Sequence, residues 1–395
     1  MLTKVLKNLI LLLCSLAATI LLIFTALELF PPLIRALRLT GIHYYGLRER
    51  YIIDPQLVFR IKPFYKIKIS DYKGDLYLPG YKVDVEPIQI EFQCDKDGFR
   101  NANYISSADT VIVGDSYIEV GRDDSDTFSG RFARHSGLSV KNIGIGWWGP
   151  IQYLIALERH ALRVNPKYAV FCFFEGNDMQ DIIQYARWYK GKAYYHFNFC
   201  RKNFFQRLWI AVTDTVNFIR SSFREKFARR NSPTIRDNKG VDIRWSEVNL
   251  ADKSIKTVFC YQNDLRPASV LLKAPEYIIL SDVLRAFKKI CVGNNIVPLL
   301  VFIPTRTHVY APYSSAVRGG PYWLKVREKQ IAARQNIEDA ITALCRDNGI
   351  RMISLTPKFE SLAKEGKFLY YPFDSHWNSE GREAAARYVA EEIRK

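Results

Sequence analysis

The stretch Thr110-Val-Ile-Val-Gly-Asp-Ser116 joins a short apolar run to a glycine, an acid and a serine. An apolar run of this length is typical of a buried strand in a parallel sheet, because helices cover both faces of such a sheet. We therefore expect this stretch to form the first strand of a sheet. Ser116 would then lie at the carboxyl end of the strand, where α/β sheets bind their ligands.

Downstream of this stretch, strand-like and helical patterns alternate. The expected strands are 110–113, 139–143, 168–174, 297–303 and 351–354. The expected helices are 126–136, 150–163, 276–294, 327–347 and 379–394. Short apolar strands separated by helices predict an α/β fold, a three-layer sandwich around a central parallel sheet. Residues 185–275 interrupt this rhythm and are interpreted as an insertion between the third and fourth strands.

The N-terminal segment is long and apolar enough to cross a bilayer as a helix. Residues 9–27 contain no charged side chain, and Lys4 and Lys7 precede them. A cleaved signal peptide is the alternative interpretation. The apolar run ends in Leu-Glu-Leu-Phe-Pro-Pro (27–32), however, which is a poor cleavage site. We therefore expect an uncleaved transmembrane helix that anchors the chain.

Between this anchor and the first strand lies a connector with a small β-rich addition. Residues 65–69 (Tyr-Lys-Ile-Lys-Ile) and 88–92 (Ile-Gln-Ile-Glu-Phe) alternate between apolar and polar side chains, which predicts half-buried strands. The predicted domains are thus the anchor at 1–35, the connector and β-rich addition at 36–108, and the α/β domain at 109–395.

Composition narrows the choice of partners. The net charge of +17 favours anionic partners such as lipid headgroups or acidic polysaccharide. No zinc-finger spacing, RNP-like motif or bZIP pattern is present, so nucleic acid is not expected. The seven cysteines form no CxxC pair and no metal-like cluster with histidine. We expect neither a metal nor a cofactor.

Two further polar clusters are expected at the same edge of the sheet as Ser116. The sequence Glu175-Gly-Asn-Asp178 ends the third strand, and an amide such as that of Asn177 can donate to an oxyanion. The sequence Asp374-Ser-His-Trp-Asn378 precedes the last helix. A serine nucleophile needs a base, and the base needs a carboxylate to orient it; His376 and Asp374 provide this pair. Each cluster alone is equally well explained as a turn or cap, but all three converge on one sheet edge.

Together these blocks resemble the SGNH (GDSL-like) hydrolase family, named for its serine, glycine, asparagine and histidine blocks. The resemblance covers about 110–185 and 297–395. It implies an SGNH/flavodoxin-like fold with Ser116 as nucleophile, His376 as general base and Asp374 as its orienter. It also implies an oxyanion hole formed by the Ser116 and Gly146 backbone N–H groups and the Asn177 side chain.

Two departures from the family pattern matter. Many members carry Asp-x-x-His, whereas here Phe373 occupies that place and the aspartate is two residues before the histidine. The form Asp-x-His-Trp-Asn is similar to that of alginate-type polysaccharide O-acetyltransferases and other envelope members. In the glycine block, Asn142-Ile-Gly-Ile-Gly-Trp-Trp-Gly149, Trp147 stands where the oxyanion glycine is expected. The backbone donor is thus either Gly146 or Trp147.

The chemistry that the resemblance implies is acyl transfer. With water as acceptor the chain is a serine-dependent esterase acting on an O-acylated glycan or lipid at the cell envelope. With a sugar hydroxyl as acceptor it is a polysaccharide O-acetyltransferase with the same triad. A non-catalytic member that binds glycan or assembles with envelope polysaccharide machinery is the third alternative.

The family resemblance also places the catalytic domain outside the cytoplasm, in the periplasm. Arg35, Arg38, Arg48 and Arg50 follow the apolar segment and oppose this orientation under the positive-inside rule. A long domain can nevertheless be translocated regardless of such charges.

The insertion contains a basic stretch with helical periodicity at 201–230, where apolar side chains include Phe205, Trp209, Val216 and Ile219. Three interpretations stay open. The helix packs on the core with a solvated basic face, it lies on an anionic membrane, or it borders a groove for an anionic glycan.

Overall fold

The computed structural model describes residues 2–39, 43–76, 85–192, 194–195, 197, 200, 202–228, 245–259, 264–316 and 320–395. The chain divides into two compact units. One unit comprises Met1–Lys62 with Arg187–Ser232, and the other comprises Pro63–Ala186 with Pro233–Lys395. The domain boundaries expected from the sequence rest on composition and stay a prediction.

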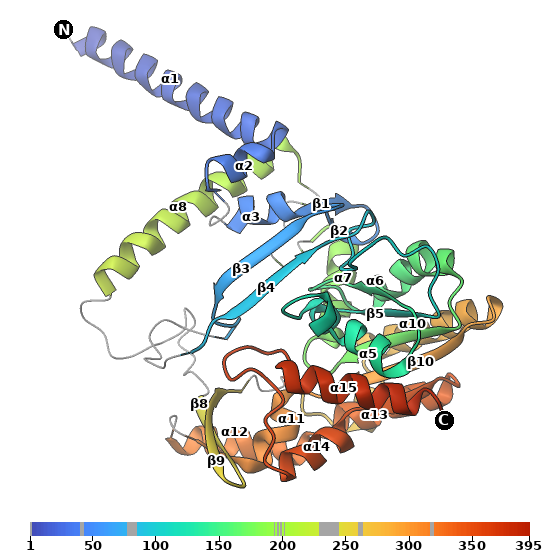
Figure 1. The fold of residues 1–395 in the computed structure, drawn as a ribbon. Helices are drawn as coiled ribbons and strands as arrows, with labels where there is room; N and C mark the ends of the chain where they lie inside the picture. Colours follow the sequence, from blue (N-terminus) through green and yellow to red (C-terminus); the bar gives the residue numbers. More distant parts are fainter. Residues whose placement is uncertain are drawn as a thin grey trace. The chain divides into compact units, whose positions relative to one another are not determined.

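The larger unit is built on a five-stranded parallel sheet (Figure 1). Its strands are β5 (Thr110–Gly114), β6 (Val140–Gly144), β7 (Tyr168–Phe174), β10 (Val297–Ile303) and β12 (Arg351–Ser354). Their order is β12-β10-β7-β5-β6, and every neighbouring pair is parallel. This is the doubly wound order, in which β6 is added on one side of β5 and β7, β10 and β12 on the other. In such sheets ligands bind beyond the carboxyl ends of the strands at this switch point, here β5 and β7. The predicted fold class is confirmed.

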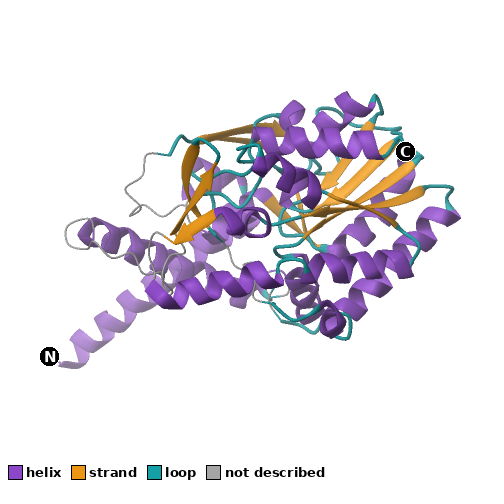
Figure 2. Ribbon diagram, turned by 90° about the horizontal axis from the view of Figure 1, so that it is seen from below, coloured by secondary structure: helices purple, strands orange, loops and turns teal. Residues whose placement is uncertain are grey.

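Helices cover both faces of this sheet (Figure 2). On one face, α5 (Phe128–Ser136), α14 (Thr356–Lys364) and α15 (Ser379–Glu392) bury side chains against Ile112 and Cys172. On the other face lie α6 (Pro150–Ala156) and α10 (Pro275–Gly293). Phe171, which points the opposite way from Cys172, contacts Tyr153 of α6 and Phe287 of α10, with ring centroids 5.2 and 5.3 Å apart.

Two helical predictions need correction in detail. The stretch expected as one helix at 327–347 is two helices, α12 (Gly320–Ala333) and α13 (Asn336–Asp347). Glu338 lies in the first turn of α13, just after the break between the two helices. Its buried carboxylate accepts hydrogen bonds from the hydroxyls of Ser354 and Thr356. The stretch expected at 150–163 begins as α6 and continues through a π-helical turn at Leu157–Ala161 and a 3-10 turn at Leu162–Val164.

Several short elements complete the larger unit. The predicted antiparallel pair is present as β3 (Lys66–Tyr72) and β4 (Ile88–Gln93). A three-stranded antiparallel sheet of β11 (Ser314–Ala316), β8 (Trp245–Leu250) and β9 (Lys253–Val258) was not expected. Its β8–β9 turn, Ala251-Asp252, lacks the glycine or asparagine that signals a hairpin. Four further helices are α4 (Ser116–Glu119), α7 (Asp178–Tyr189), α9 (Ala268–Leu271) and α11 (Arg306–Tyr310).

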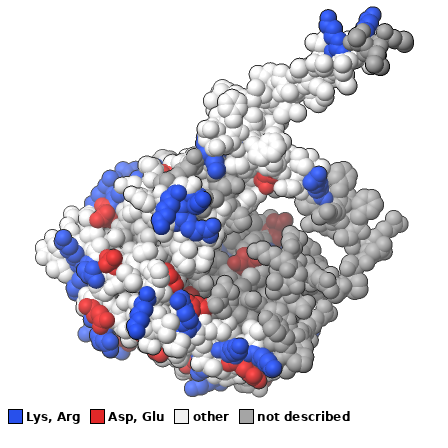
Figure 3. All heavy atoms as spheres, turned by 180° about the vertical axis from the view of Figure 1, so that it is seen from behind, with Lys and Arg blue, Asp and Glu red and all other residues white. Residues whose placement is uncertain are grey.

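The smaller unit carries the apolar N-terminal helix. Its elements are α1 (Leu2–Leu29), α2 (Pro32–Ala36), α3 (His43–Arg50), the antiparallel hairpin β1 (Tyr51–Asp54) and β2 (Val58–Ile61), and α8 (Phe204–Ala228). Over Lys4–Leu29 the mean hydropathy of α1 reaches 2.7, which suffices for a membrane span and is also found in signal sequences. In Figure 3 most of this helix shows no charged side chain, and blue Lys and Arg spheres stand at its N-terminal tip.

The first turn of α15 packs directly on the segment that precedes it. Asn378 caps this helix, because its side-chain oxygen accepts from the Gly381 N–H at 2.9 Å while its amide nitrogen donates to the Phe368 carbonyl at 2.6 Å. A Cβ on Gly381 would lie 2.0 Å from the Leu369 carbonyl oxygen. Glycine is therefore required here by close approach.

We expect the substitution Gly381→Ala to lower the free energy of unfolding by about 1–3 kcal/mol, because backbone rather than a flexible side chain must move. The midpoint of urea unfolding of the detergent-solubilised chain measures this. Gly293→Ala is the matched control, since a Cβ there meets nothing within 4 Å, and we expect a change within about 0.5 kcal/mol. Equal midpoints for the two variants would contradict the close packing at Gly381.

Candidate active site

Ser116 lies at the junction of β5 and α4, as the sequence predicts. The strand ends at Gly114, and the Asp115 carboxylate accepts the Tyr117 N–H at 2.9 Å to start the helical turn. A Cβ on Gly114 would lie 2.5 Å from a side-chain carbon of Ile118, so only glycine lets α4 fold back so closely on the strand. This sharp turn presents Ser116 at the carboxyl edge of the sheet.

The loop before α15 presents Asp374 and His376. The Tyr371 N–H donates to the His376 carbonyl at 3.0 Å, which closes the loop. The guanidinium of Arg306, buried at the start of α11, donates to the carbonyl oxygens of Tyr371, Pro372 and Asp374. A charged donor held among three carbonyl groups fixes the path of the backbone on both sides of Asp374.

The three residues predicted as a triad form one hydrogen-bonded chain. The His376 Nε2 lies 2.7 Å from the Ser116 Oγ, and the His376 Nδ1 lies 2.6 Å from the Asp374 Oδ1. The His376 backbone N–H also donates to this carboxylate oxygen at 2.9 Å. The shorter Asp-x-His spacing is therefore compatible with a triad, because the local turn lets one oxygen accept from both the backbone and the ring.

The side chain of Tyr117 contacts both the ring of His376 and the loop that carries it. Its hydroxyl donates to the Ser375 carbonyl, and its ring centroid lies 5.1 Å from that of His376 and 4.9 Å from that of Trp377. Tyr117 follows Ser116 directly in the chain, so the residue next to the serine fixes the loop that carries the histidine.

The second oxygen of Asp374 is held by the β-rich addition, which the sequence did not indicate. The Tyr72 hydroxyl donates to Asp374 Oδ2 at 2.8 Å, and the Asp75 N–H donates to the same atom at 3.0 Å. The Asp75 carboxylate in turn accepts the N–H and the hydroxyl of Ser375 at 2.7 and 2.6 Å. A Cβ on Gly74 would come 2.1 Å from the Phe373 carbonyl oxygen, so the two segments touch through their backbones.

No motif marks Tyr72 and Asp75, because they precede Asp374 by about 300 positions in a segment whose only signal is strand alternation. The sequence Asp97-Gly-Phe-Arg100 also lies upstream of the serine. Its arginine, Arg100, is buried and donates to the carbonyl oxygens of Glu119, the last residue of α4, and of Gly121.

The predicted oxyanion donors lie at the same edge of the sheet. A Cβ on Gly146 would lie 3.4 Å from the Ser116 Cβ, so this backbone is next to the nucleophile. The Gly146 N–H, however, donates to Glu119 Oε2 at 2.6 Å, and it can bind an oxyanion only after leaving this carboxylate. Trp147, the alternative donor, has a left-handed backbone with φ of 68°. The role of Gly146 stays a prediction.

Asn177 follows β7, the strand beside β5. Its side-chain nitrogen donates one hydrogen to Asp181 Oδ2 at 2.9 Å, which fixes the orientation of the amide. Within the described part of the chain this nitrogen makes no second hydrogen bond, and the side-chain oxygen is buried without a partner. The role of Asn177 as an oxyanion donor, like that of Gly146, stays a prediction.

Electrostatics favour a charged histidine in the resting site. Burial alone would lower the pKa of His376, but the charge and hydrogen bond of Asp374, together with Asp75 and Asp115, raise it to about 9. Burial alone would raise the pKa of Asp374, but His376 and its other donors hold it well below the ordinary range. Burial raises the pKa of Asp115 to about 6.

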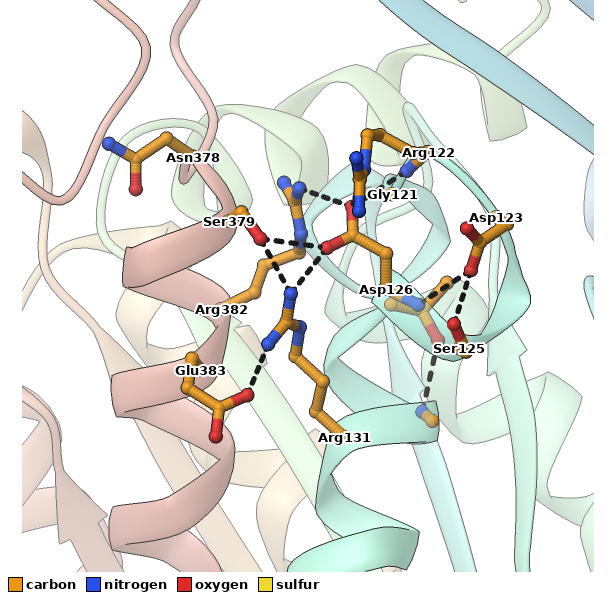
Figure 4. Close-up of polar contacts among 12 residues, drawn as sticks. Gly121, Arg122, Asp123, Ser125, Asp126, Arg131, Asn378, Ser379, Arg382 and Glu383 are labelled. Carbon is orange, nitrogen blue, oxygen red and sulfur yellow. Dashed lines mark hydrogen bonds and ion pairs between the residues drawn. The ribbon is translucent and has the colours of Figure 1, made fainter.

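A buried ionic network ties the serine block to the histidine block (Figure 4). Asp126, in the loop after α4, accepts from Arg131 at 2.6 Å and from Arg382 at 2.5 Å. Arg382, on α15, also donates to the Trp377 carbonyl at 2.6 Å, one residue beyond the histidine. The hydroxyl of Ser379 completes the link by donating to Asp126.

Asp75, Asp374 and His376 also form a group whose oxygen and nitrogen atoms lie within 4.8 Å of one another, close enough to hold a cation. A cation there would compete with the His376 Nδ1–H for the Asp374 oxygen. In this structure the group is held by hydrogen bonds from His376 and Ser375 to the two carboxylates.

A sheet in this order, with a serine after its first strand and Asp-x-His before its last helix, defines an SGNH-type hydrolase fold. Residues 293–395, which include the histidine block, match the family model described as SGNH hydrolase-like domain, acetyltransferase AlgX. This match confirms the predicted SGNH resemblance over these residues, and its description agrees with the expected class, esterase or O-acyltransferase. No curated protein sequence matches the chain.

Similar solved structures share little sequence with the chain. The acetyl xylan esterase AlAXEase is 12% identical, covering 72% of this chain and 99% of its own, with a TM-score of 0.35. A GDSL-like lipase from Bacteroides thetaiotaomicron is 10% identical, covering 72% and 87%, with a TM-score of 0.34. The psychrotrophic esterase EstA from Pseudoalteromonas sp. is 10% identical, covering 72% and 97%, with a TM-score of 0.33. Similarity at this level carries no argument about activity.

The raised pKa of His376 predicts how activity depends on pH. The histidine must be neutral to accept the serine proton, and with a pKa of about 9 it is mostly protonated at neutral pH. We expect kcat/KM for a model acetyl ester to rise about tenfold per pH unit below this pKa and to level off above it. Removing the Asp75 charge with Asp75→Asn should move the midpoint to lower pH, because one of the carboxylates that stabilise the imidazolium is lost.

Asp71→Asn is the control, since Asp71 is an exposed acid on β3, four residues before Asp75. It removes the same charge and should leave the pH profile unchanged. If the Asp75→Asn midpoint coincided with that of the unsubstituted chain, or if activity fell rather than rose toward pH 9, the electrostatic role given to Asp75 and His376 would be wrong.

Proposed function

We propose that the chain is a membrane-anchored O-acetyltransferase of the cell envelope, in which Ser116 carries the acyl group and a polysaccharide hydroxyl receives it. The observation that carries the proposal is the Ser116–His376–Asp374 chain, with its 2.7 and 2.6 Å contacts. A non-catalytic member would be free to separate the serine from the histidine. Here the two lie within direct hydrogen-bond reach, which supports catalysis.

In the first half-reaction the Ser116 Oγ attacks the carbonyl carbon of an acyl ester while His376 Nε2 takes its proton. Asp374 holds the imidazolium that forms. Negative charge develops on the former carbonyl oxygen, where the Ser116 N–H and the Asn177 amide would donate to it. The intermediate collapses by breaking the ester C–O bond, the leaving alcohol takes the proton from His376, and Ser116 is left acylated.

In the second half-reaction His376 takes a proton from the acceptor hydroxyl, whose oxygen attacks the acyl-serine. Collapse breaks the bond to the Ser116 Oγ, which recovers its proton from His376. No group beyond the chain's own residues is needed for either step. The site is thus equally able to use water, and the identity of the acceptor decides between transferase and esterase.

The match of 293–395 to the AlgX acetyltransferase model favours a sugar hydroxyl as acceptor. An acylated polysaccharide is accordingly the substrate class we propose, and the envelope polysaccharide machinery is the associated partner. Acyl-ester hydrolysis of a glycan or lipid is the second candidate, because the triad chemistry is identical until the acceptor arrives.

An envelope substrate requires the site to lie outside the cytoplasm. We propose that α1 remains as an uncleaved anchor. Glu28, near the end of α1, pairs with Arg48 at 3.1 Å and with Arg207 at 3.3 Å, so α1 is bonded to α3 and α8 of its own unit. A segment removed by processing would have no use for these ion pairs.

The acceptor is tested with the full chain, a model acetyl ester as donor, and reactions with and without oligosaccharides of anionic polysaccharides. We expect acetyl transfer to sugar, with free acetate as the minor product, and loss of both products by at least about 10³-fold in Ser116→Ala. Mass spectrometry of the sugars and an acetate assay quantify the two products.

If acetate were the only product and its release still required Ser116, the chain would be an esterase and the transferase proposal would be wrong. Turnover that survives in Ser116→Ala would remove Ser116 from the reaction altogether.

A further inference from the structure

Helix α8 carries an apolar face that no described residue of the chain covers. Phe205, Trp209, Val216 and Ile219 are spaced four, seven and three residues apart and therefore lie on one side of the helix. Their side chains are 72%, 69%, 41% and 47% exposed. The interpretation that this helix buries its apolar face against the core is therefore not what the structure shows.

The opposite side of α8 is bonded to its own unit. Arg207 pairs with Glu28, Asp214 accepts the Tyr44 N–H at 2.6 Å, and Ala211 is buried. These three residues recur at spacings of four and three, so they share the side turned away from the apolar face. The exposed face is thus held outward by specific contacts.

The contacts also connect α8 to the apolar N-terminal helix. Arg207 lies in the first turn of α8, and Glu28 lies in the last turn of α1. The two helices therefore meet where α1 would leave the hydrocarbon region of a bilayer. From this junction α8 leads away from α1 and does not run alongside it (Figure 1).

We propose that α8 lies in the headgroup region of the membrane that α1 spans, with Phe205, Trp209, Val216 and Ile219 turned into the lipid. This inference uses the anchor proposed above and is independent of the chemistry at Ser116. An aromatic and aliphatic face beside cationic residues is the pattern of an interfacial helix. Arg220 is exposed next to Ile219, and Arg224 and Lys226 follow in sequence, which matches anionic lipid headgroups.

Lipid fits this face better than a protein partner. Helix α8 belongs to the same compact unit as α1 and is joined to it on its other side by the Arg207–Glu28 ion pair, so insertion of α1 brings α8 to the bilayer surface. Trp209 has both an apolar ring and an N–H donor, which suits the boundary between acyl chains and water. A fixed α8 would make the smaller unit a two-point membrane attachment rather than a flexible tether.

The experiment places an environment-sensitive fluorophore (NBD) on single cysteines of the full chain. The parent has Cys14 and Cys260 replaced by serine, and its residual labelling gives the background from the buried cysteines. Trp209→Cys reports the proposed lipid face. Asn217→Cys reports an exposed site on the same helix, about a third of a turn from that face. Native Cys14, retained in a separate sample, reports α1.

The chain is reconstituted in phosphatidylcholine–phosphatidylglycerol vesicles, with and without doxyl-labelled acyl chains. We expect NBD at position 209 to shift its emission to the blue and to lose most of its intensity to the doxyl quencher, as NBD at Cys14 does. NBD at position 217 should keep its aqueous spectrum. Quenching at Cys14 without quenching at 209 would overturn the inference while leaving the anchor in place.

A blue shift at 209 without doxyl quenching would overturn it as well, because that result means a protein surface covers the face. Since activity is not measured, failure of the acetyltransferase proposal would not affect any of these outcomes.

Discussion

The hydrogen bond between the Ser116 Oγ and the His376 Nε2 joins residues 260 positions apart, and the fold is arranged so that this bond can form. The serine is fixed by the turn from β5 into α4. The histidine is fixed by a loop clamped between Arg306 and the first turn of α15. The Asp126–Arg382 ion pair then connects the two blocks away from solvent. A buried pair of this kind adds little net stability, but it fixes one geometry because a mispaired alternative would leave a charge uncompensated.

The contacts of Asp374, the carboxylate of the proposed triad, show how the β-rich addition belongs to the site. A buried carboxylate is costly unless its oxygens accept hydrogen bonds. Asp374 receives two donors from His376 on one oxygen and two from Tyr72 and Asp75 on the other. Tyr72 is the last residue of β3 and Asp75 follows it, so both outer donors lie outside the parallel sheet. The addition therefore supplies part of the electrostatic balance that sets the pKa of His376, and we expect a chain without it to lose that balance.

The sequence predicts the features of this structure that depend on local patterns, and it does not predict those that depend on contacts between distant segments. The five sheet strands and the places of Ser116, Asn177 and His376 follow from apolar runs and polar clusters, which are local patterns. Other residues contact the site from distant segments, and no local sequence pattern predicts their partners. These residues are Tyr72, Asp75 and Arg306. The small β11-β8-β9 sheet was not predicted because its hairpin turn lacks a turn-specific residue. The engagement of Gly146 with Glu119 likewise depends on tertiary position, which spacing alone does not give.

Mass spectrometry of the chain during turnover tests the role of Ser116 most directly. Full-length protein is mixed with a model acetyl ester, quenched in acid within the first turnovers and digested. We expect acetyl on the peptide that contains Ser116, and a shorter lifetime of that species when a sugar acceptor is added. Turnover without any acetylated Ser116, or with the acetyl group on another residue, would contradict acyl transfer through this serine.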